Sequence, residues 1–149
     1  MLDRMELAPE AVLVTHVGGT YGDTEASRAR WAGTWPTLPE HVRRRLVLEH
    51  DGIRFSAADT IWIHGHAGVP LVSDYQRHWC LNPAGLVAVD ALRAMLRTWP
   101  AGVRPEVRAR HPQEEGRTAA AGVDGPRGLH QAVRVRALHA GRGRAGGWA

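Results

Sequence analysis

Three apolar stretches of this sequence each end on a side chain that can bind a metal ion. AVLVTH ends at His16, RRLVLE at Glu49 and VPLVSD at Asp74. One imidazole and two carboxylates form a mixed nitrogen and oxygen donor set, which suits Mn²⁺, Zn²⁺ or Fe²⁺. The pattern therefore predicts a divalent-metal site made of residues that lie far apart in the chain.

Each of these residues also has a structural interpretation when it is considered alone. A lone histidine at the end of a strand, such as His16, more often makes a hydrogen bond that holds its loop. A carboxylate at the position of Glu49 can pair with an arginine instead of a metal ion. Asp74 is the better candidate because a polar, aromatic-rich stretch follows it directly. The metal-site hypothesis therefore requires a fold that brings the three residues together.

The spacing of the three residues predicts such a fold. Apolar runs of about four to eight residues are typical of buried strands in parallel sheets. Helix-length segments separate the runs, and alternating strands and helices imply right-handed crossovers and a parallel sheet. In a (β/α) barrel the active site lies at the carboxyl ends of the strands. His16, Glu49 and Asp74 would then share one end of the sheet.

Local sequence signals set the expected bounds of the elements. Apolar runs predict strands at 11–16, 45–49 and 69–74, and a weaker fourth strand at 103–108. Capping residues and helical spacing predict helices at 25–35, 57–67 and 85–99. The predicted fold class is α/β, a partial TIM (β/α) barrel of about three to four βα units over residues 1–107. A complete barrel needs about 250 residues, and this chain has 149.

Residues 108–149 differ in composition and are predicted to form a low-order, largely disordered Arg/Gly/Ala-rich tail. They contain few large apolar residues, and only 129–140 has weak helical character. The net charge is +4, all nineteen basic residues are arginine, and nine of them follow Val103. This charge permits nucleic acid as a partner, although arginine without lysine also fits a GC-rich coding sequence.

Composition argues against several classes of protein. No run of about 18 apolar residues is present, so no membrane span is expected. The first ten residues, MLDRMELAPE, lack the apolar core of a secretory signal. Cys80 is the only cysteine, which excludes an intramolecular disulfide and a cysteine-rich zinc site. A cytoplasmic, reducing location is therefore the default expectation.

The ordered motifs of this chain resemble the UV damage endonucleases over residues 11–107. The matching segments are THVGGTYGDTEAS, then LPEHVRRRLVLEHDGIRFSAADTIWIHGHAGVPLVSDYQRHWCLNP, then LRTWPAGVRP. The resemblance implies a metal-dependent TIM-barrel enzyme that nicks damaged double-stranded DNA on the 5′ side of ultraviolet photoproducts. It also implies that His16, Glu49 and Asp74 bind a divalent metal, with manganese expected first and zinc or magnesium as alternatives.

The chain departs from the family pattern at several positions. Family members usually carry histidine three residues after the strand-end aspartate, where this chain has Arg77. Glu106 and Arg108 stand where the family usually has the lysine and histidine of a Lys-x-His motif. We therefore expect impaired incision by this chain, and a second chain completing the barrel would be a partner.

Residues near the three predicted ligands have expected roles of their own. His50 and Asp51 are expected to orient Glu49, and solvated loop positions are the alternative. His78 is expected to join a metal cluster or to serve as a general base. His64 and His66 are interpreted as surface residues.

Two other functions remain open from the sequence. One is a xylose-isomerase-like, metal-dependent TIM-barrel enzyme that acts on a small molecule, although LVLEHD and WCLNP favour the endonuclease. The other is a non-enzymatic basic protein that binds nucleic acid through the arginine-rich tail. It predicts salt-dependent binding that is indifferent to lesions.

Overall fold

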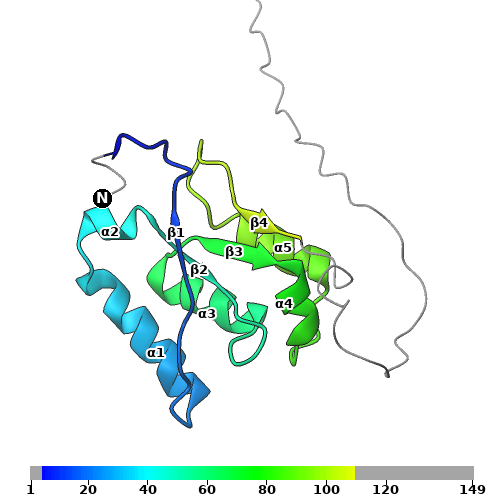
Figure 1. The fold of residues 1–149 in the computed structure, drawn as a ribbon. Helices are drawn as coiled ribbons and strands as arrows, with labels where there is room; N and C mark the ends of the chain where they lie inside the picture. The colour runs from blue at the N-terminus through cyan, green and yellow to red at the C-terminus, as the bar shows by residue number, and fades with distance from the viewer. Residues whose placement is uncertain (1–4, 110–149) are drawn as a thin grey trace, which may run out of the picture. The chain divides into compact units, whose positions relative to one another are not determined.

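The computed structural model describes residues 5–109, which form a four-stranded parallel sheet with helices (Figure 1). The strands lie in sequence order, and residues such as Leu13 and Leu46, or Ser73 and Val107, are paired in register. Consecutive parallel strands that are direct neighbours are the arrangement of a (β/α) barrel. The strands are β1 (Leu13–Thr15), β2 (Leu46–Glu49), β3 (Leu71–Asp74) and β4 (Val107–Arg108).

Six helical segments connect these strands. Side-chain caps begin three of them: Asp23 accepts a hydrogen bond from the N–H of Ala26, and Ser56 and Asp59 form a capping box. Asp74 caps the third by accepting from the N–H of Arg77. The segments are α1 (Thr24–Thr34), the 3₁₀ helix η2 (Trp35–Thr37), α2 (Glu40–Arg43), α3 (Ala57–Ala67), α4 (Tyr75–Cys80) and α5 (Ala88–Leu96).

The structure confirms the predicted fold class, and it differs most from the expected bounds in three places. Helix α4 lies in the polar stretch for which no helix was predicted, because the cap at Asp74 starts a helix directly after β3. Helix α5 begins at Ala88 because Gly85 has a left-handed backbone, with φ of 64°. Strand β4 is short because Pro105 has no N–H to donate to a neighbouring strand.

Side chains alternate between the two faces of the sheet along each strand. Leu48 and Leu71 are buried in the cluster that includes residues of α1, α3 and α5. Val47 and Val72 lie in a second cluster with Trp99, whose indole N–H donates to the carbonyl of Leu71 at 2.7 Å. The alternation therefore places the strand-end residues Glu49 and Asp74 on the face of Val47 and Val72, opposite the helices.

Most of the predicted tail lies outside the residues that the structure describes. The prediction of a low-order segment at 108–149, with weak helix at 129–140, concerns residues that lie almost entirely beyond the described range. Arg108 is inside that range and belongs to β4. Within residues 5–109 no helix is both long enough and apolar enough to cross a lipid bilayer.

Candidate functional site at the carboxyl ends of the strands

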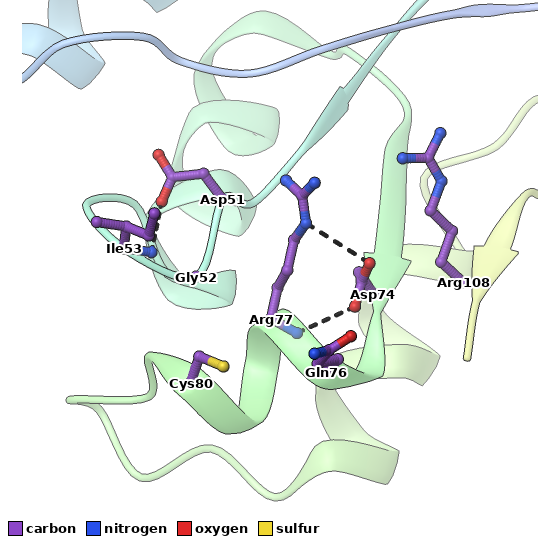
Figure 2. A pocket seen from close by; sticks show the side chains of 8 residues that line it. All are labelled: Asp51, Gly52, Ile53, Asp74, Gln76, Arg77, Cys80 and Arg108. Atoms are coloured by element: carbon purple, nitrogen blue, oxygen red, sulfur yellow. Dashed lines mark hydrogen bonds and ion pairs between the residues drawn. The ribbon is translucent and has the colours of Figure 1, made fainter. Parts of the chain in front are cut away.

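The three predicted ligands lie at the same end of the sheet. His16 follows β1, Glu49 is the last residue of β2 and Asp74 is the last residue of β3. Together with Arg77 and Arg108 they form what we term the strand-end cluster. A cavity of about 260 Å³ lies beside it, lined by Asp51, Gly52, Ile53, Asp74, Gln76, Arg77, Cys80 and Arg108 (Figure 2).

His16 and Glu49 are in direct contact. Glu49 is fully buried, and its Oε2 lies 3.5 Å from Nε2 of His16. The other ring nitrogen of His16, Nδ1, lies 3.0 Å from the carbonyl oxygen of Glu49. A proton on Nδ1 satisfies this second contact and leaves a lone pair on Nε2. The fold therefore brings two of the three predicted ligands together.

Asp74 belongs to the cluster through Arg77. Its Oδ1 accepts from the N–H of Arg77 at 3.0 Å, and its Oδ2 lies 3.6 Å from Nε of Arg77 (Figure 2). The backbone N–H of Asp74 donates to Nε2 of His50 at 3.2 Å. Asp74 is therefore both the cap of α4 and an ion-pair partner of the first arginine in that helix.

The guanidinium of Arg77 lies among the predicted ligands. Its Nη1 is 2.9 Å from Nε2 of His16, 3.3 Å from the carbonyl oxygen of His50 and 3.5 Å from Oε2 of Glu49. The backbone of Arg77 is held against Gly52, where an added Cβ would lie 3.0 Å from Cα and Cβ of Arg77. The backbone and Cβ of Arg77 are therefore held in place by close packing at Gly52 and by the hydrogen bond to Asp74.

Arg108 reaches the same carboxylate from β4. Its Nη1 donates to Oε2 of Glu49 at 3.0 Å, and its Nε donates to Oε1 of Glu106 at 3.0 Å. Oε2 of Glu49 thus faces two guanidinium groups and one imidazole. The other oxygen, Oε1, is buried and has no hydrogen-bond partner in the described part of the chain.

Burial shifts the protonation of two groups at this end of the sheet. Burial raises the pKa of Glu49 above its ordinary value, and the charges of Arg77 and Arg108 oppose that rise. Burial lowers the pKa of His50 to about 4. A neutral His50 agrees with its geometry, since Nε2 accepts a hydrogen bond from Asp74 and must carry a lone pair.

The donor atoms do not fit a metal ion in this arrangement. Among residues 5–109 no group of three or more His, Cys, Asp or Glu side chains is placed to hold one. Nε2 of His16 and Oε2 of Glu49 are close enough to share an ion, but the guanidinium of Arg77 lies against both. The role of His16, Glu49 and Asp74 as ligands therefore stays a prediction.

A family model described as UV-endonuclease UvdE matches residues 1–120 of this chain. The chain belongs to the UV-endonuclease UvdE family. It is 32% identical over 127 residues to the UV DNA damage endonuclease of Bacillus pumilus, covering 83% of this chain and 40% of that protein. With the Bacillus velezensis UV DNA damage endonuclease it shares 33% identity over 117 residues, or 77% of this chain and 36% of that protein.

A solved structure of a UvdE-type protein agrees with the fold. The crystal structure of SacUVDE matches 83% of this chain and 42% of its own chain, at 32% identity and a TM-score of 0.67. This likeness confirms the partial barrel predicted from the order of strands and helices. The chain spans about two fifths of the length of these relatives.

Several residues near the strand-end cluster make contacts that differ from the roles expected of them. His50 binds the backbone of Asp74. Asp51 shapes its own loop by accepting from three consecutive backbone N–H groups, those of residues 53, 54 and 55. His78 is buried with Nε2 3.0 Å from the carbonyl oxygen of Leu86, which is a structural contact. His64, interpreted as a surface residue, is half-buried, and its Nδ1 lies 2.8 Å from the carbonyl oxygen of Val69.

Sequence reasoning identified Arg77 and Arg108 only as departures from the family pattern. Their contacts with Glu49 join residues 28 and 59 positions apart in the chain. No local motif specifies such contacts. The available signal was the place of Arg77 three residues after β3 and of Arg108 at the end of β4, on the same end as the predicted ligands.

Proposed function

We propose that this chain acts on DNA that carries ultraviolet photoproducts, as a UV damage endonuclease whose incision activity is weak in the chain by itself. Family membership and the partial barrel support the proposal. The observation that carries it is the buried carboxylate of Glu49, at the end of a parallel strand and 3.5 Å from His16. Active sites of (β/α) barrels are built from residues at this end of the strands.

Phosphodiester hydrolysis requires stabilisation of negative charge on the phosphate and removal of a proton from water. The cavity beside the strand-end cluster offers the guanidinium groups of Arg77 and Arg108 and the carboxylate of Asp74. The two guanidinium groups can contact a phosphate, and the carboxylate of Asp74 can accept a proton. Since both guanidinium groups are paired with carboxylates, their attraction for phosphate is reduced, which supports weak activity.

The divalent metal is a separate part of this proposal. Manganese is the first candidate, with zinc or magnesium as alternatives, and any such ion would have to displace Arg77 to reach His16, Glu49 and Asp74. The position of Arg77 argues against such an ion in the present arrangement. Damaged double-stranded DNA is the proposed partner, and a chain that completes the barrel is a second one.

The proposal is tested by nicking of irradiated and unirradiated duplex DNA by the full chain in millimolar Mn²⁺. We expect slow nicking of irradiated DNA only, reduced to background by Glu49→Gln. Glu25→Gln is the matched control, since Glu25 is an exposed carboxylate on α1 in an ion pair with Arg28. Equal nicking of both DNAs, or nicking that survives Glu49→Gln, contradicts the proposal.

Other outcomes favour the alternative functions. Lesion-indifferent, salt-dependent DNA binding that is lost when the chain is cut after Val107 favours a basic nucleic-acid-binding protein. Metal-dependent turnover of polyols without any activity on DNA favours a sugar-isomerase-like enzyme. Either result overturns the endonuclease proposal.

A further inference from the structure

We propose that the guanidinium groups of Arg77 and Arg108 serve as built-in cations of the strand-end cluster and keep divalent metal ions out of it. The inference rests on the proposed function only in assuming that this end of the sheet is the functional one.

The first support is that Arg77 lies against the donor atoms that a metal ion would need. Nη1 of Arg77 lies 2.9 Å from Nε2 of His16 and 3.3 Å from Nδ1, so it stands against the face of the imidazole ring. The same Nη1 is 3.5 Å from Oε2 of Glu49. A divalent ion shared by these two donors would lie beside the guanidinium, and repulsion between the two cations opposes its binding.

The second support is the balance of charge. The two deeply buried carboxylates of the cluster, Glu49 and Asp74, face two guanidinium groups. Glu106, which is partly exposed, also pairs with Arg108. Arginine keeps its charge in proteins, so the two guanidinium groups cancel two of these three negative charges without an added ion. A divalent cation would add two positive charges beside Arg77 and Arg108, and repulsion between like charges at short range opposes its binding.

The third support is that the arginines are held in position. The backbone N–H of Arg77 donates a hydrogen bond to Asp74. The Cα of Arg77 packs on Gly52, which leaves no room for a Cβ on residue 52. Arg108 is anchored through Nε to Glu106. Each guanidinium uses separate nitrogens for its anchor and for Glu49, as the planar fork of arginine allows. Lysine, with a single nitrogen, could not make both contacts in the same way.

The test is Mn²⁺ binding by isothermal titration calorimetry on the full chain. We expect Arg77→Ala/Arg108→Ala to bind one Mn²⁺ about tenfold more tightly than the wild type, or better, because removing the two cations leaves Glu49 and His16 open. Mn²⁺ should also raise the Tm of this double variant and leave that of the wild type unchanged.

The matched control is Arg93→Ala/Arg97→Ala, which removes the same charge from two exposed arginines at the end of α5. We expect it to bind Mn²⁺ as weakly as the wild type. Adding Glu49→Gln to the double variant should abolish the gain, which locates the binding at the strand-end cluster.

Wild-type binding as tight as that of Arg77→Ala/Arg108→Ala overturns the inference, as does a gain that survives Glu49→Gln. If the double variant folds neither with nor without Mn²⁺, Arg77→His replaces it. This variant removes one cation and supplies an imidazole donor, and failure to bind Mn²⁺ more tightly than the wild type also overturns the inference.

This experiment is independent of the nicking assay. Tight Mn²⁺ binding by the double variant without any lesion-dependent nicking would support the inference and contradict the proposed function. Lesion-dependent nicking by a wild-type chain that binds Mn²⁺ tightly would support the proposed function and contradict the inference.

Discussion

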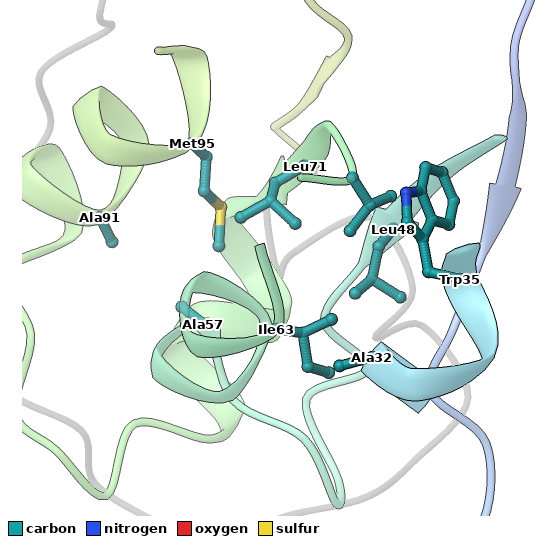
Figure 3. Packing of buried hydrophobic residues seen from close by; sticks show 9 residues of the cluster. Ala32, Trp35, Leu48, Ala57, Ile63, Leu71, Ala91 and Met95 are labelled. Carbon is teal, nitrogen blue, oxygen red and sulfur yellow. The ribbon is translucent and has the colours of Figure 1, made fainter. Parts of the chain in front are cut away.

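Leu48 and Glu49 are neighbours on β2 and both are fully buried, but they are buried in different ways. Leu48 packs among the apolar side chains contributed by the helices, where Ile63 and Leu71 lie beside it (Figure 3). Glu49 lies on the opposite face of the strand, at the strand-end cluster with Arg77 and Arg108. The first environment is stabilised by removing apolar surface from water. The second pays a desolvation cost that its ion pairs offset.

This difference indicates which region holds the fold together. Apolar burial contributes net free energy at every contact, whereas buried ion pairs often contribute little compared with an apolar replacement. We therefore expect the helix-packed face to determine stability and the strand-end cluster to be dispensable for it. Four substitutions or conditions test this comparison, in decreasing order of effect.

Leu48→Ala should lower the free energy of unfolding by about 3 kcal/mol, because it leaves a cavity among side chains of several elements. Urea denaturation followed by circular dichroism measures the change. Leu13→Ala is the control, since Leu13 on β1 is 53% exposed and should cost much less. Equal losses at the two positions would show that the helix-packed face is not the stabilising region.

Gly52→Ala should cost about 2 to 3 kcal/mol, because Gly52 has φ of 71° and an added Cβ meets Arg77 at 3.0 Å. Gly68→Ala provides the matched control. Gly68 has a similar φ of 75° but no atom near its added Cβ, so backbone strain alone should cost about 1 kcal/mol there. Denaturation midpoints that match for the two variants would show that the contact with Arg77 is loose.

Acidification should destabilise the chain through His50. Its pKa falls from 6.5 in the unfolded chain to about 4 in the folded one, so the unfolded chain takes up the proton first as the pH falls. The stabilisation is fully present above the unfolded pKa and is lost as the pH falls toward the folded pKa. Between about pH 7 and pH 5 the loss should be about 2 kcal/mol.

His50→Gln removes this titration while keeping a group that can accept from the N–H of Asp74. The difference between the two stability profiles isolates His50 from other titrating groups, including Glu49. Parallel profiles for the wild type and the variant would mean that His50 takes up a proton in the folded chain without cost.

Glu49→Gln should change the free energy of unfolding by less than about 1 kcal/mol. Both guanidinium groups are partly exposed, and each keeps another carboxylate, Asp74 for Arg77 and Glu106 for Arg108. The variant loses the ion pairs of Glu49 together with the cost of burying its charge. A loss above about 2 kcal/mol in urea denaturation would show that the strand-end cluster also stabilises the fold.

The sequence predicts the framework of this molecule well because the relevant signals are local. Apolar runs mark the strands, and the helix after Ser56 is bounded by a capping box and a left-handed Gly68. The short helix α4 is missed because the residues after Asp74 are interpreted only as a polar stretch, while the carboxylate of Asp74, interpreted as a metal ligand, also caps a helix. One side chain thus has two chemical interpretations that the sequence alone does not separate.

The candidate site is predicted only in part. The strand ends bring His16 and Glu49 together, as the parallel fold requires. The contacts of Arg77 with His16 and of Arg108 with Glu49 span 61 and 59 residues. They depend on the packing of α4 and on the path into β4, which no local pattern determines. The contacts of the cluster's two cations could therefore be established only in three dimensions.

The most direct test of the account is anomalous diffraction from crystals of the wild-type chain and of Arg77→Ala/Arg108→Ala, both grown with Mn²⁺. The central claim is that guanidinium groups, and not a metal ion, neutralise Glu49. We expect no anomalous peak within bonding distance of Glu49 in the wild type and one peak between His16 and Glu49 in the variant. A peak at that position in the wild type, with Arg77 turned away, would contradict the claim.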